Sequence, residues 1–231
     1  MRSALRLVWR VLVVSALLLL LYQAWIFAHV VWWIRFDPAS SRFMEDRLEV
    51  LQERNPDAGL RHRWVPYERI SIHLKRAVIA AEDGKFLDHE GFDWDALQRA
   101  YEKNLRKGRV VAGGSTISQQ LAKNLFLSSQ RTPWRKAQEA VITVMLEAVM
   151  SKRRILEIYL NVIEWGNGVF GAEAAARHYF RTSAAALGPE QAARLAAMVP
   201  NPRFYDRHRN TAHLSRHTGV ILARMPGTTV P

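Results

Sequence analysis

An uncharged apolar run near the N-terminus sets the strongest limit on what this chain can become. Residues 11–34 contain no Asp, Glu, Lys or Arg. At 1.5 Å per residue, a helix of this length covers about 36 Å, which exceeds the hydrocarbon core of a bilayer at about 30 Å. Trp32 and Trp33 lie near the end of the run, where interfacial aromatic residues are common. The sequence therefore predicts one membrane-spanning anchor over residues 11–34.

A cleaved secretory signal peptide is the alternative interpretation of this run. Such a peptide has an apolar core of about 7–15 residues, followed by an Ala-x-Ala cleavage site. The run is longer and no such site follows it, so we interpret it as a retained anchor. Residues 1–10 hold three arginines and no acid. Because positive charge stays on the cytoplasmic side, we expect residues 1–10 in the cytoplasm and the rest of the chain outside.

The net charge of the chain limits the classes of partner that we expect it to bind. The 231 residues carry a net charge of +12, which favours nucleic acid, phospholipid headgroups or phosphorylated substrates. A basic domain held at a membrane meets headgroups and lipid-linked phosphates first, so we expect no nucleic-acid partner. No cysteine is present, which excludes disulfides and thiolate metal sites.

Helical periodicity dominates the chain after the anchor. We interpret residues 35–60 as a juxtamembrane segment, residues 61–220 as one mainly α domain, and residues 221–231 as a C-terminal tail. The stretch HLSRHTGVILARMPGTTVP, residues 213–231, predicts one last basic helix followed by a frayed end. Short strands are compatible with 60–72 or 107–112, although no pattern there requires a sheet. Helices are expected over residues 42–54, 73–83, 94–108, 115–127, 133–150, 151–165, 171–180 and 188–199.

The stretch EDGKFLDHEG, residues 82–91, ends an apolar helix on two adjacent acids. The helix macrodipole disfavours an anion at a C-terminus, so a carboxyl there beside an apolar wall should have a raised pKa, which suits proton transfer. The alternative is a solvated helix end in which Asp83 and Gly84 only make the turn. His89 is expected to brace the loop. The neighbouring acids match no EF-hand or zinc spacing, so we expect no metal site in the protein.

The stretch GGSTISQQLAKN, residues 113–124, predicts a helix that Ser115 or Thr116 caps after two glycines. Free N–H groups at a helix N-terminus behind such a turn can bind an anion. An ordinary capped helix with a polar side is the alternative. The polar side chains expected on one face of this helix are those of Gln119, Gln120 and Lys123.

The stretch RKAQE, residues 135–139, holds a second carboxylate. Glu139 follows Arg135 by four residues, so the two side chains share a helix face. Residues 140–146 are apolar on all sides of the helix apart from Thr143, which predicts burial and places the pair in a cleft. The alternative is a surface ion pair. Positive charge from Arg131, Arg135 and Lys136 would suit a phosphorylated leaving group.

Two carboxylates beside a basic anion site, all tethered to a membrane, describe glycosyl transfer from a lipid diphosphate donor. In agreement, residues 70–205 resemble the bacterial peptidoglycan glycosyltransferase family, and within it the monofunctional enzymes. Ser118 stands where threonine is usual. The motifs that carry the resemblance are EDGKFLDHEG (82–91), GGSTISQQLAKN (113–124), RKAQE (135–139), ILEIYLN (155–161) and WGNGVFGAEAAARHYF (165–180).

The resemblance implies a mainly α, lysozyme-like fold with a smaller membrane-facing lobe. It implies polymerisation of lipid II into β-1,4-linked glycan strands at the bacterial inner membrane, by a single inverting displacement that releases undecaprenyl pyrophosphate. Glu82 would be the general base for the acceptor hydroxyl, and Glu139 would assist departure or orient the pyrophosphate. The family implies no required cofactor, although Mg²⁺ or Mn²⁺ can accompany the substrate pyrophosphate. Cell-wall synthesis or division proteins are further expected partners.

The resemblance also assigns roles to individual residues around these two carboxylates. Leu125, Phe126 and Leu127 would dip into the membrane interface, with core packing as the alternative. The residues expected to neutralise the diphosphate are Lys123, Arg131, Arg135 and Lys136. Those expected to line the cleft are Ser115, Thr116, Gln119 and Gln120. Those expected to brace the site are Asp83, Phe86, His89 and Gly91.

Three other functions are open to a chain of this pattern. A lysozyme or lytic transglycosylase also uses a Glu on an α-rich fold, but glycan cleavage has no pyrophosphate to bind. A catalytically silent anchor that binds glycan or anionic lipid would not need both glutamates with their basic neighbours. A bifunctional penicillin-binding protein is not expected, because the chain ends at Pro231 and contains no Ser-x-x-Lys nucleophile motif.

Overall fold

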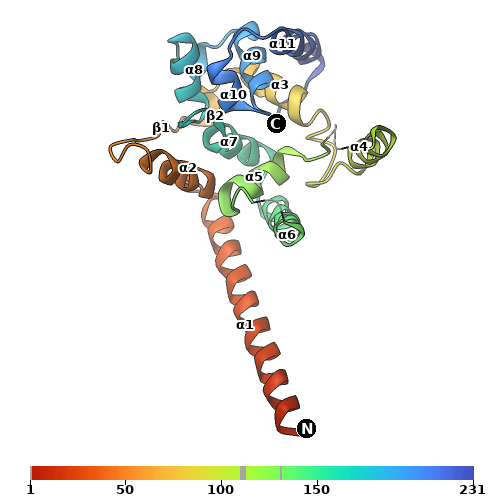
Figure 1. Ribbon diagram of the computed structural model, residues 1–231. Coiled ribbons are helices and arrows are strands. Elements are labelled where there is room, and N and C mark those ends of the chain that lie inside the picture. The colour runs from red at the N-terminus through yellow and green to blue at the C-terminus, as the bar shows by residue number, and fades with distance from the viewer. Residues whose placement is uncertain (1, 110–112, 131) are drawn as a thin grey trace.

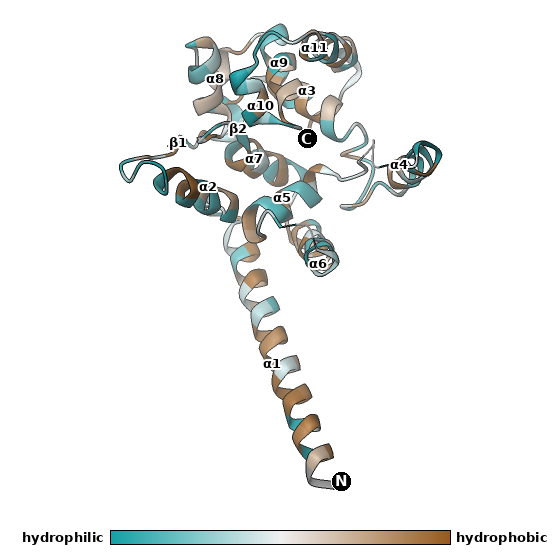
Figure 2. Ribbon diagram, in the orientation of Figure 1, coloured by the Kyte–Doolittle hydropathy of each residue, from teal (hydrophilic) through white to brown (hydrophobic). Residues whose placement is uncertain are grey.

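The computed structural model describes residues 2–109, 113–130 and 132–231, and most of them are helical (Figure 1). The first helix, α1 (Arg2–Trp32), projects from a folded domain that contains the rest of the chain. Its stretch Ala4–Trp32 has a mean hydropathy of 2.3 and is long and apolar enough to cross a membrane. Figure 2 shows that brown, hydrophobic residues prevail along this helix. These features agree with a membrane anchor.

The helices expected from periodicity are present, with boundaries set by local caps. Asp93 accepts a hydrogen bond from the Ala96 N–H at 2.8 Å at the start of α4, and Gly108 ends that helix with φ = 60°. Pro133 opens α6. The helices after α1 are α2 (Arg42–Gln52), α3 (Ile72–Glu82), α4 (Trp94–Lys107), α5 (Ile117–Phe126), α6 (Pro133–Val149), α7 (Lys152–Val162), α8 (Ala172–Phe180), α9 (Pro189–Met198), α10 (Pro202–Arg207) and α11 (Ala212–Arg224).

A small sheet replaces the end of one expected helix. Its strands are β1 (Arg61–His62), β2 (Glu164–Gly166) and β3 (Val169–Phe170), in the order β1-β3-β2. β1 is parallel to β3, and β2 is antiparallel to it. The helix expected over 151–165 therefore ends early, at Val162. Gly168 makes the turn between β2 and β3 with φ = 70°, a conformation that glycine adopts without strain.

The domain has two helical layers joined by α7. In one layer, α9 packs against α3 and α11; in the other, α5 packs against α2 and α6. α7 contacts α5 and α8, and seven of its residues between 155 and 162 are buried. Asn161 on α7 accepts a hydrogen bond from Val65 N–H at 3.0 Å and donates one to Val65 O at 2.9 Å. These bonds fix the segment before α3 to the centre of the domain.

The anchor is packed against the domain at its C-terminal end. Ile26 and Val30 of α1 are fully buried, and α1 contacts α6. The amide of Gln23 donates a hydrogen bond to Gln138 Oε1 on α6 at 2.7 Å. The Trp33 ring, just after α1, lies 5.1 Å from the Phe126 ring of α5. The end of α1 is therefore a structural part of the domain.

The expectation that residues 140–146 are buried on every side is wrong. On α6, Val141 is 41% exposed, Val144 is 57% exposed and Trp134 is 64% exposed. These residues lie on the same side of the helix, since they are spaced by seven and three residues. A helix that is apolar all round suits a membrane as well as a protein core, and α6 lies beside the apolar anchor (Figure 2).

For the apolar residues at the end of α5, the structure favours core packing. Leu125 and Leu127 are only 4% and 6% exposed, respectively. Phe126 contacts the anchor through Trp33. Of the two alternatives left open by the sequence, the burial of Leu125 and Leu127 supports core packing.

The C-terminal residues also differ from expectation. The Tyr67 hydroxyl donates a hydrogen bond to Pro231 O at 2.6 Å. Met225 is buried, and it packs in the same core as Ile221. The tail is therefore attached to the domain rather than frayed. At the other end, α2 lies inside the interval expected to be juxtamembrane, and it packs on α5.

We predict that Gly91→Ala destabilises the domain while Gly84→Ala does not. Gly91 has φ = +87°, and an added Cβ would lie 2.7 Å from Thr143 Cγ2 on α6. Backbone strain and overpacking together should cost about 2–4 kcal/mol. For a chain of this size, that lowers the unfolding temperature by roughly 5–15 °C. Gly84 has open space around it. Thermal unfolding of both variants in detergent checks this, and equal losses would contradict it.

Candidate active site

Glu82 is the last residue of α3, and its carboxylate faces α5. The amide of Gln120 on α5 donates a hydrogen bond to Glu82 Oε2 at 2.7 Å. Burial raises the pKa of the Glu82 carboxyl, and this effect prevails although Gln120 and the positive charge of Lys123 lower it. A carboxyl that holds its proton more tightly than usual is suited to accept one from a substrate.

Asp83 ties α3 to α5 directly behind Glu82. It is 6% exposed. Its Oδ2 accepts a hydrogen bond from the N–H of Ile117, the first residue of α5, at 3.0 Å. Its Oδ1 accepts one from His89 Nε2 at 2.9 Å. Phe86 is buried below this loop, with Lys152 Nζ 4.7 Å from its ring centroid. The two adjacent acids therefore have different positions: Glu82 faces the cleft, and Asp83 connects α3 to α5.

Thr116 caps α5 and connects it to the EDGKFLDHEG loop. The Thr116 and Gln119 side chains form a capping box with each other's backbone N–H groups. The Thr116 hydroxyl also donates a hydrogen bond to Gly91 O at 2.6 Å. Of the two capping candidates in the sequence, Thr116 is the N-cap. Gln119 is 3% exposed and its side-chain oxygen is engaged in this cap.

A buried tyrosine fixes the orientation of Gln120. The Tyr159 hydroxyl on α7 donates a hydrogen bond to Gln120 Oε1 at 2.9 Å. Burial raises the pKa of Tyr159 well above its usual value, and the negative charges of Glu82 and Asp83 raise it further. The phenol therefore stays protonated and acts as a donor. Because it occupies the amide oxygen of Gln120, the amide nitrogen is held toward Glu82.

Glu139 occupies a different environment, among cations. It is 3% exposed. Arg135 Nη1 lies 2.9 Å from one of its carboxylate oxygens, and Lys136 Nζ contacts the other. Lys123 is near this group on α5; burial lowers its pKa, while the charge of Glu139 opposes that shift. The expected pairing of Arg135 with Glu139 is present, and the carboxylate is buried rather than on the surface.

Glu82 and its hydrogen-bond partner Gln120 line two different cavities. One, the Lys123 cavity, has a volume of about 340 Å³. The other, the Glu82 cavity, has a volume of about 250 Å³. The Lys123 cavity is lined by Phe43, Gln120, Lys123, Asn124, Ser129, Arg135, Tyr159, Ile163, Glu164, Val199, Pro200, Asn201, Pro202 and Arg203. The Glu82 cavity is lined by Ala80, Ala81, Glu82, Asp83, Gly84, Lys85, Asp93, Ala96, Arg99, Gly113, Gly114, Ser115, Thr116 and Arg224.

The structure brings together most of the residues that the sequence singled out. Ser115 and Thr116 line the Glu82 cavity, whereas Gln120 and Lys123 line the Lys123 cavity. Lys136 is half exposed and contacts Glu139 without lining either cavity. Arg131, expected at the diphosphate, lies outside the described residues. Among the described residues, no cluster of three His, Asp or Glu could hold a metal ion.

Sequence reasoning missed four residues of the site. Phe43 and Arg203 line the Lys123 cavity from α2 and α10. Ser118 donates a hydrogen bond to Glu147 and so joins α5 to α6. Tyr159 orients Gln120. The ILEIYLN motif marks the position of Tyr159, but the partner of its hydroxyl lies 39 residues away in the chain, so spacing alone could not identify it.

Comparisons with known proteins find one family. The transglycosylase family model matches residues 48–226. A biosynthetic peptidoglycan transglycosylase of Methylobacillus flagellatus is 67% identical over 226 residues, which cover 98% of this chain and 99% of that protein. A protein of the same name from Aromatoleum aromaticum is 64% identical over 231 residues, all of both chains. One from Nitrosospira multiformis is 67% identical over 223 residues, which cover 96% and 97% of the two chains.

We predict that Glu82→Gln stabilises the protein at neutral pH. The pKa of Glu82 is raised in the folded protein. The stabilisation of the folded state by the protonated carboxyl is therefore fully present below the pKa of the unfolded chain. It is lost as the pH rises through the pKa of the folded protein. At pH 8 the ionised carboxylate therefore opposes folding, and an amide removes that cost. The unfolding temperature of Glu82→Gln should exceed that of wild type at pH 8, and the difference should shrink toward pH 4.

Glu139→Gln is the matched control and should act in the opposite direction. Removing this carboxylate leaves Arg135 and Lys136 without their partner. The loss should be about 1–3 kcal/mol at pH 8. A destabilised Glu82→Gln, or a stabilised Glu139→Gln, would contradict the environments described for the two acids.

Proposed function

The chain belongs to the transglycosylase family, and we propose that it polymerises lipid II into the β-1,4-linked glycan strands of bacterial peptidoglycan. On this proposal the growing strand is the donor and a second lipid II is the acceptor. Family membership makes the protein a glycosyltransferase for cell-wall synthesis. The roles of individual residues in the reaction are our proposal, and they rest on the geometry of the cleft.

The observation that carries the proposal is the pair of cavities that Glu82 and its hydrogen-bond partner Gln120 line. A hydrolase needs one bound glycan and a water molecule, whereas a polymerase must hold two saccharides with a base between them. The Glu82 carboxylate lines one cavity, and its partner Gln120 lines the other. We assign the Lys123 cavity to the donor diphosphate and the Glu82 cavity to the acceptor sugar.

The charges of the two cavities support this assignment. Lys123 and Arg135 both line the Lys123 cavity, and cations there would stabilise the negative charge that develops on a departing diphosphate. Glu139 would hold the Arg135 guanidinium in place, since it is bonded to it at 2.9 Å. In that role Glu139 assists departure by fixing cations rather than by transferring a proton.

The reaction would proceed in one displacement. Glu82 takes the proton of the acceptor 4-hydroxyl while the oxygen attacks the anomeric carbon of the donor. The bond from that carbon to the diphosphate oxygen breaks, and its electron pair leaves with undecaprenyl pyrophosphate. Attack from the side opposite the leaving group converts an α-linked centre into a β bond. The burial that raises the pKa of Glu82 makes it a better proton acceptor in this step.

A divalent cation would accompany the substrate rather than occupy a protein site. Glu139 has both oxygens bonded to cations. Glu164, at the edge of the Lys123 cavity, is paired through Oε1 with Arg47 at 3.1 Å and through Oε2 with Arg203 at 3.6 Å. Neither carboxylate offers a free oxygen. We propose that Mg²⁺ or Mn²⁺, when bound, is coordinated by diphosphate oxygens and lowers the charge that Lys123 and Arg135 must neutralise.

The same geometry separates this proposal from its rivals. Glycan cleavage produces no diphosphate, so it would not account for Lys123 and Arg135 in the cleft. A protein that only binds glycan or anionic lipid would not require a carboxyl with a raised pKa at Glu82. Glycosyl transfer explains both features.

We propose that the anchor holds the domain on the outer face of the bacterial inner membrane. The arginines before the apolar stretch favour a cytoplasmic N-terminus. The exposed apolar side of α6, formed by Trp134, Val141 and Val144, would then enter the outer leaflet beside α1. Substrates that keep their polyprenyl chains in the bilayer could reach a cleft held at this height. Division or cell-wall synthesis proteins would be partners on the same side.

The reaction is tested by incubating the detergent-solubilised full-length protein with labelled lipid II. Wild type should form polymer that a muramidase digests. Glu82→Gln should lower the rate by about 10²–10⁴-fold, the usual contribution of general acid–base catalysis. Glu139→Gln should also impair polymerisation. If wild type makes no polymer but shortens preformed glycan, the lytic rival is correct; binding of lipid II with neither activity would favour the silent anchor.

Tyr159→Phe should shift the pH dependence of polymerisation. Without the phenol, the Gln120 amide is free to rotate away from Glu82. Because the hydrogen bond from Gln120 lowers the pKa of Glu82, its loss raises that pKa and moves the ascending limb of the pH–rate profile to higher pH. At pH 7 we expect kcat to fall about three- to tenfold, with the deficit shrinking as pH rises.

Tyr179→Phe is the control for this variant. It also removes a bonded phenol, whose hydroxyl donates to Trp165 O at 2.8 Å, but it is not among the residues that line either cavity. Its ascending limb should coincide with that of wild type. A Tyr159→Phe profile that is merely lower, without a shift, would show that the tyrosine acts only in packing.

A further inference from the structure

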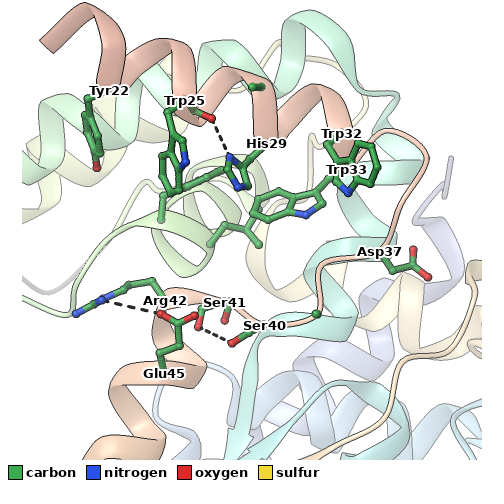
Figure 3. A pocket seen from close by; sticks show the side chains of 14 residues that line it. Tyr22, Trp25, His29, Trp32, Trp33, Asp37, Ser40, Ser41, Arg42 and Glu45 are labelled. Atoms are coloured by element: carbon green, nitrogen blue, oxygen red, sulfur yellow. Dashed lines mark hydrogen bonds and ion pairs between the residues drawn. The ribbon is translucent and has the colours of Figure 1, made fainter. Parts of the chain in front are cut away.

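An open groove lies between the outer end of the anchor and the domain (Figure 3). Its volume is about 800 Å³. One wall is α1, and the facing wall is formed by the segment Asp37–Glu45 and the end of α5. Figure 3 shows Tyr22, Trp25 and His29 projecting from α1 toward the turn that carries Arg42. We call this feature the anchor groove; the proposed reaction assigns nothing to it.

The α1 wall of the anchor groove is a continuous row of rings. Tyr22 and Trp25 have ring centroids 6.3 Å apart, Trp25 and His29 4.3 Å, and His29 and Trp33 5.7 Å. Trp33 then contacts Phe126 of α5 at 5.1 Å. The row therefore runs from the apolar stretch of the anchor to the helix that carries Lys123.

The anchor groove and the Lys123 cavity lie on opposite sides of a thin partition. At the start of α2, Arg42 lines the groove and Phe43 lines the cavity. At the end of α5, Asn124 lines the cavity and Leu125 lines the groove. Lys123 Nζ lies 5.5 Å from the Phe43 ring centroid on the cavity side. In both places, residues that are neighbours in the chain line the anchor groove on one side and the Lys123 cavity on the other.

The charges near this partition favour an occupant whose anion lies in the cavity. Arg42, at the rim of the groove, is paired with Asp46 at 2.8 Å, and Asp37 is paired with Arg154 at 2.9 Å. In the described part of the chain, Lys123 forms no ion pair within 4 Å. The headgroup of a phospholipid in the groove would have no unpaired cation to bind there, because Arg42 is already paired with Asp46. A molecule with a diphosphate at Lys123 and an apolar chain beyond it matches both spaces.

We propose that the anchor groove holds the isoprenoid chain of the lipid-linked diphosphate donor. This inference rests on the proposed function, and it names where the donor leaves the bilayer. The diphosphate binds at Lys123 and Arg135, and the chain passes over the start of α2 and lies along the aromatic row. Branched, unsaturated isoprene units pack against aromatic faces and remain in contact with the bilayer through the open side.

The test uses a bulky side chain that fills the groove without adding charge. Ala28 lines the anchor groove, whereas Ala24, one helical turn earlier, does not. The full-length variants Ala28→Trp and Ala24→Trp are assayed with lipid II carrying a full-length chain and with an analogue carrying two isoprene units. Ala28→Trp should raise KM for the long-chain substrate at least about tenfold. Its activity on the short-chain analogue, and both activities of Ala24→Trp, should match wild type.

These outcomes separate the groove from the reaction. If wild type polymerises lipid II and Ala28→Trp treats both chain lengths as wild type does, the groove does not hold the chain and only this inference fails. If wild type polymerises neither substrate, the proposed function fails as well. Equal loss on both substrates would show that Ala28→Trp disturbs the cleft itself, and this also overturns the inference.

Photo-crosslinking distinguishes the isoprenoid from a membrane phospholipid. A benzophenone amino acid replaces Ala28 or Ala24 in protein reconstituted in vesicles of phosphatidylethanolamine and phosphatidylglycerol with lipid II. Mass analysis should find the lipid II adduct at position 28 in excess over position 24. Phospholipid adducts alone at position 28 would overturn the proposal.

Discussion

The arrangement of the cleft depends on the carboxylate of Asp83. It accepts hydrogen bonds from the first N–H of α5 and from His89, and an anion at a helix N-terminus is electrostatically favourable. This one group joins the end of α3 to the start of α5. Glu82 is therefore fixed beside Gln120, and the direction of α5 determines where Lys123 lies. A neutral residue at position 83 would leave both helix ends without this connection.

The two glutamates have the same side chain, but their surroundings give the two carboxyl groups different properties. Glu82 has one amide donor and a desolvated carboxyl whose pKa is raised. Glu139 has two cations in contact, so its charge is balanced within the protein. In the proposed reaction Glu82 accepts a proton and Glu139 organises cations. One acid at a helix end and the other among basic side chains would suit these two roles.

Local features of the sequence predicted much of this structure. The parts that could not be predicted depend on contacts between segments that are distant in the chain. The caps at Asp93 and Thr116 depend on residues within one helical turn, so they could be recognised by spacing. The contact of Tyr159 with Gln120 and the strand pair of Arg61 with Val169 join segments 39 and 108 residues apart. No periodicity encodes such pairs. The family motifs supplied part of this missing information, because they identified the segments that meet in the cleft.

The error on α6 shows which physical question a hydrophobic pattern leaves open. Apolar residues on every side of a helix mean that water is absent on every side, but they do not say whether protein or lipid replaces it. On α6, Ile142 and Leu146 are buried against the domain, whereas Val141 and Val144 are exposed. A helix beside a membrane anchor has both kinds of neighbour. The same reasoning applies to α1, where Ile26 is buried and Trp25 lines the anchor groove, so one apolar helix can serve as an anchor, a packing partner and a wall of the proposed lipid path.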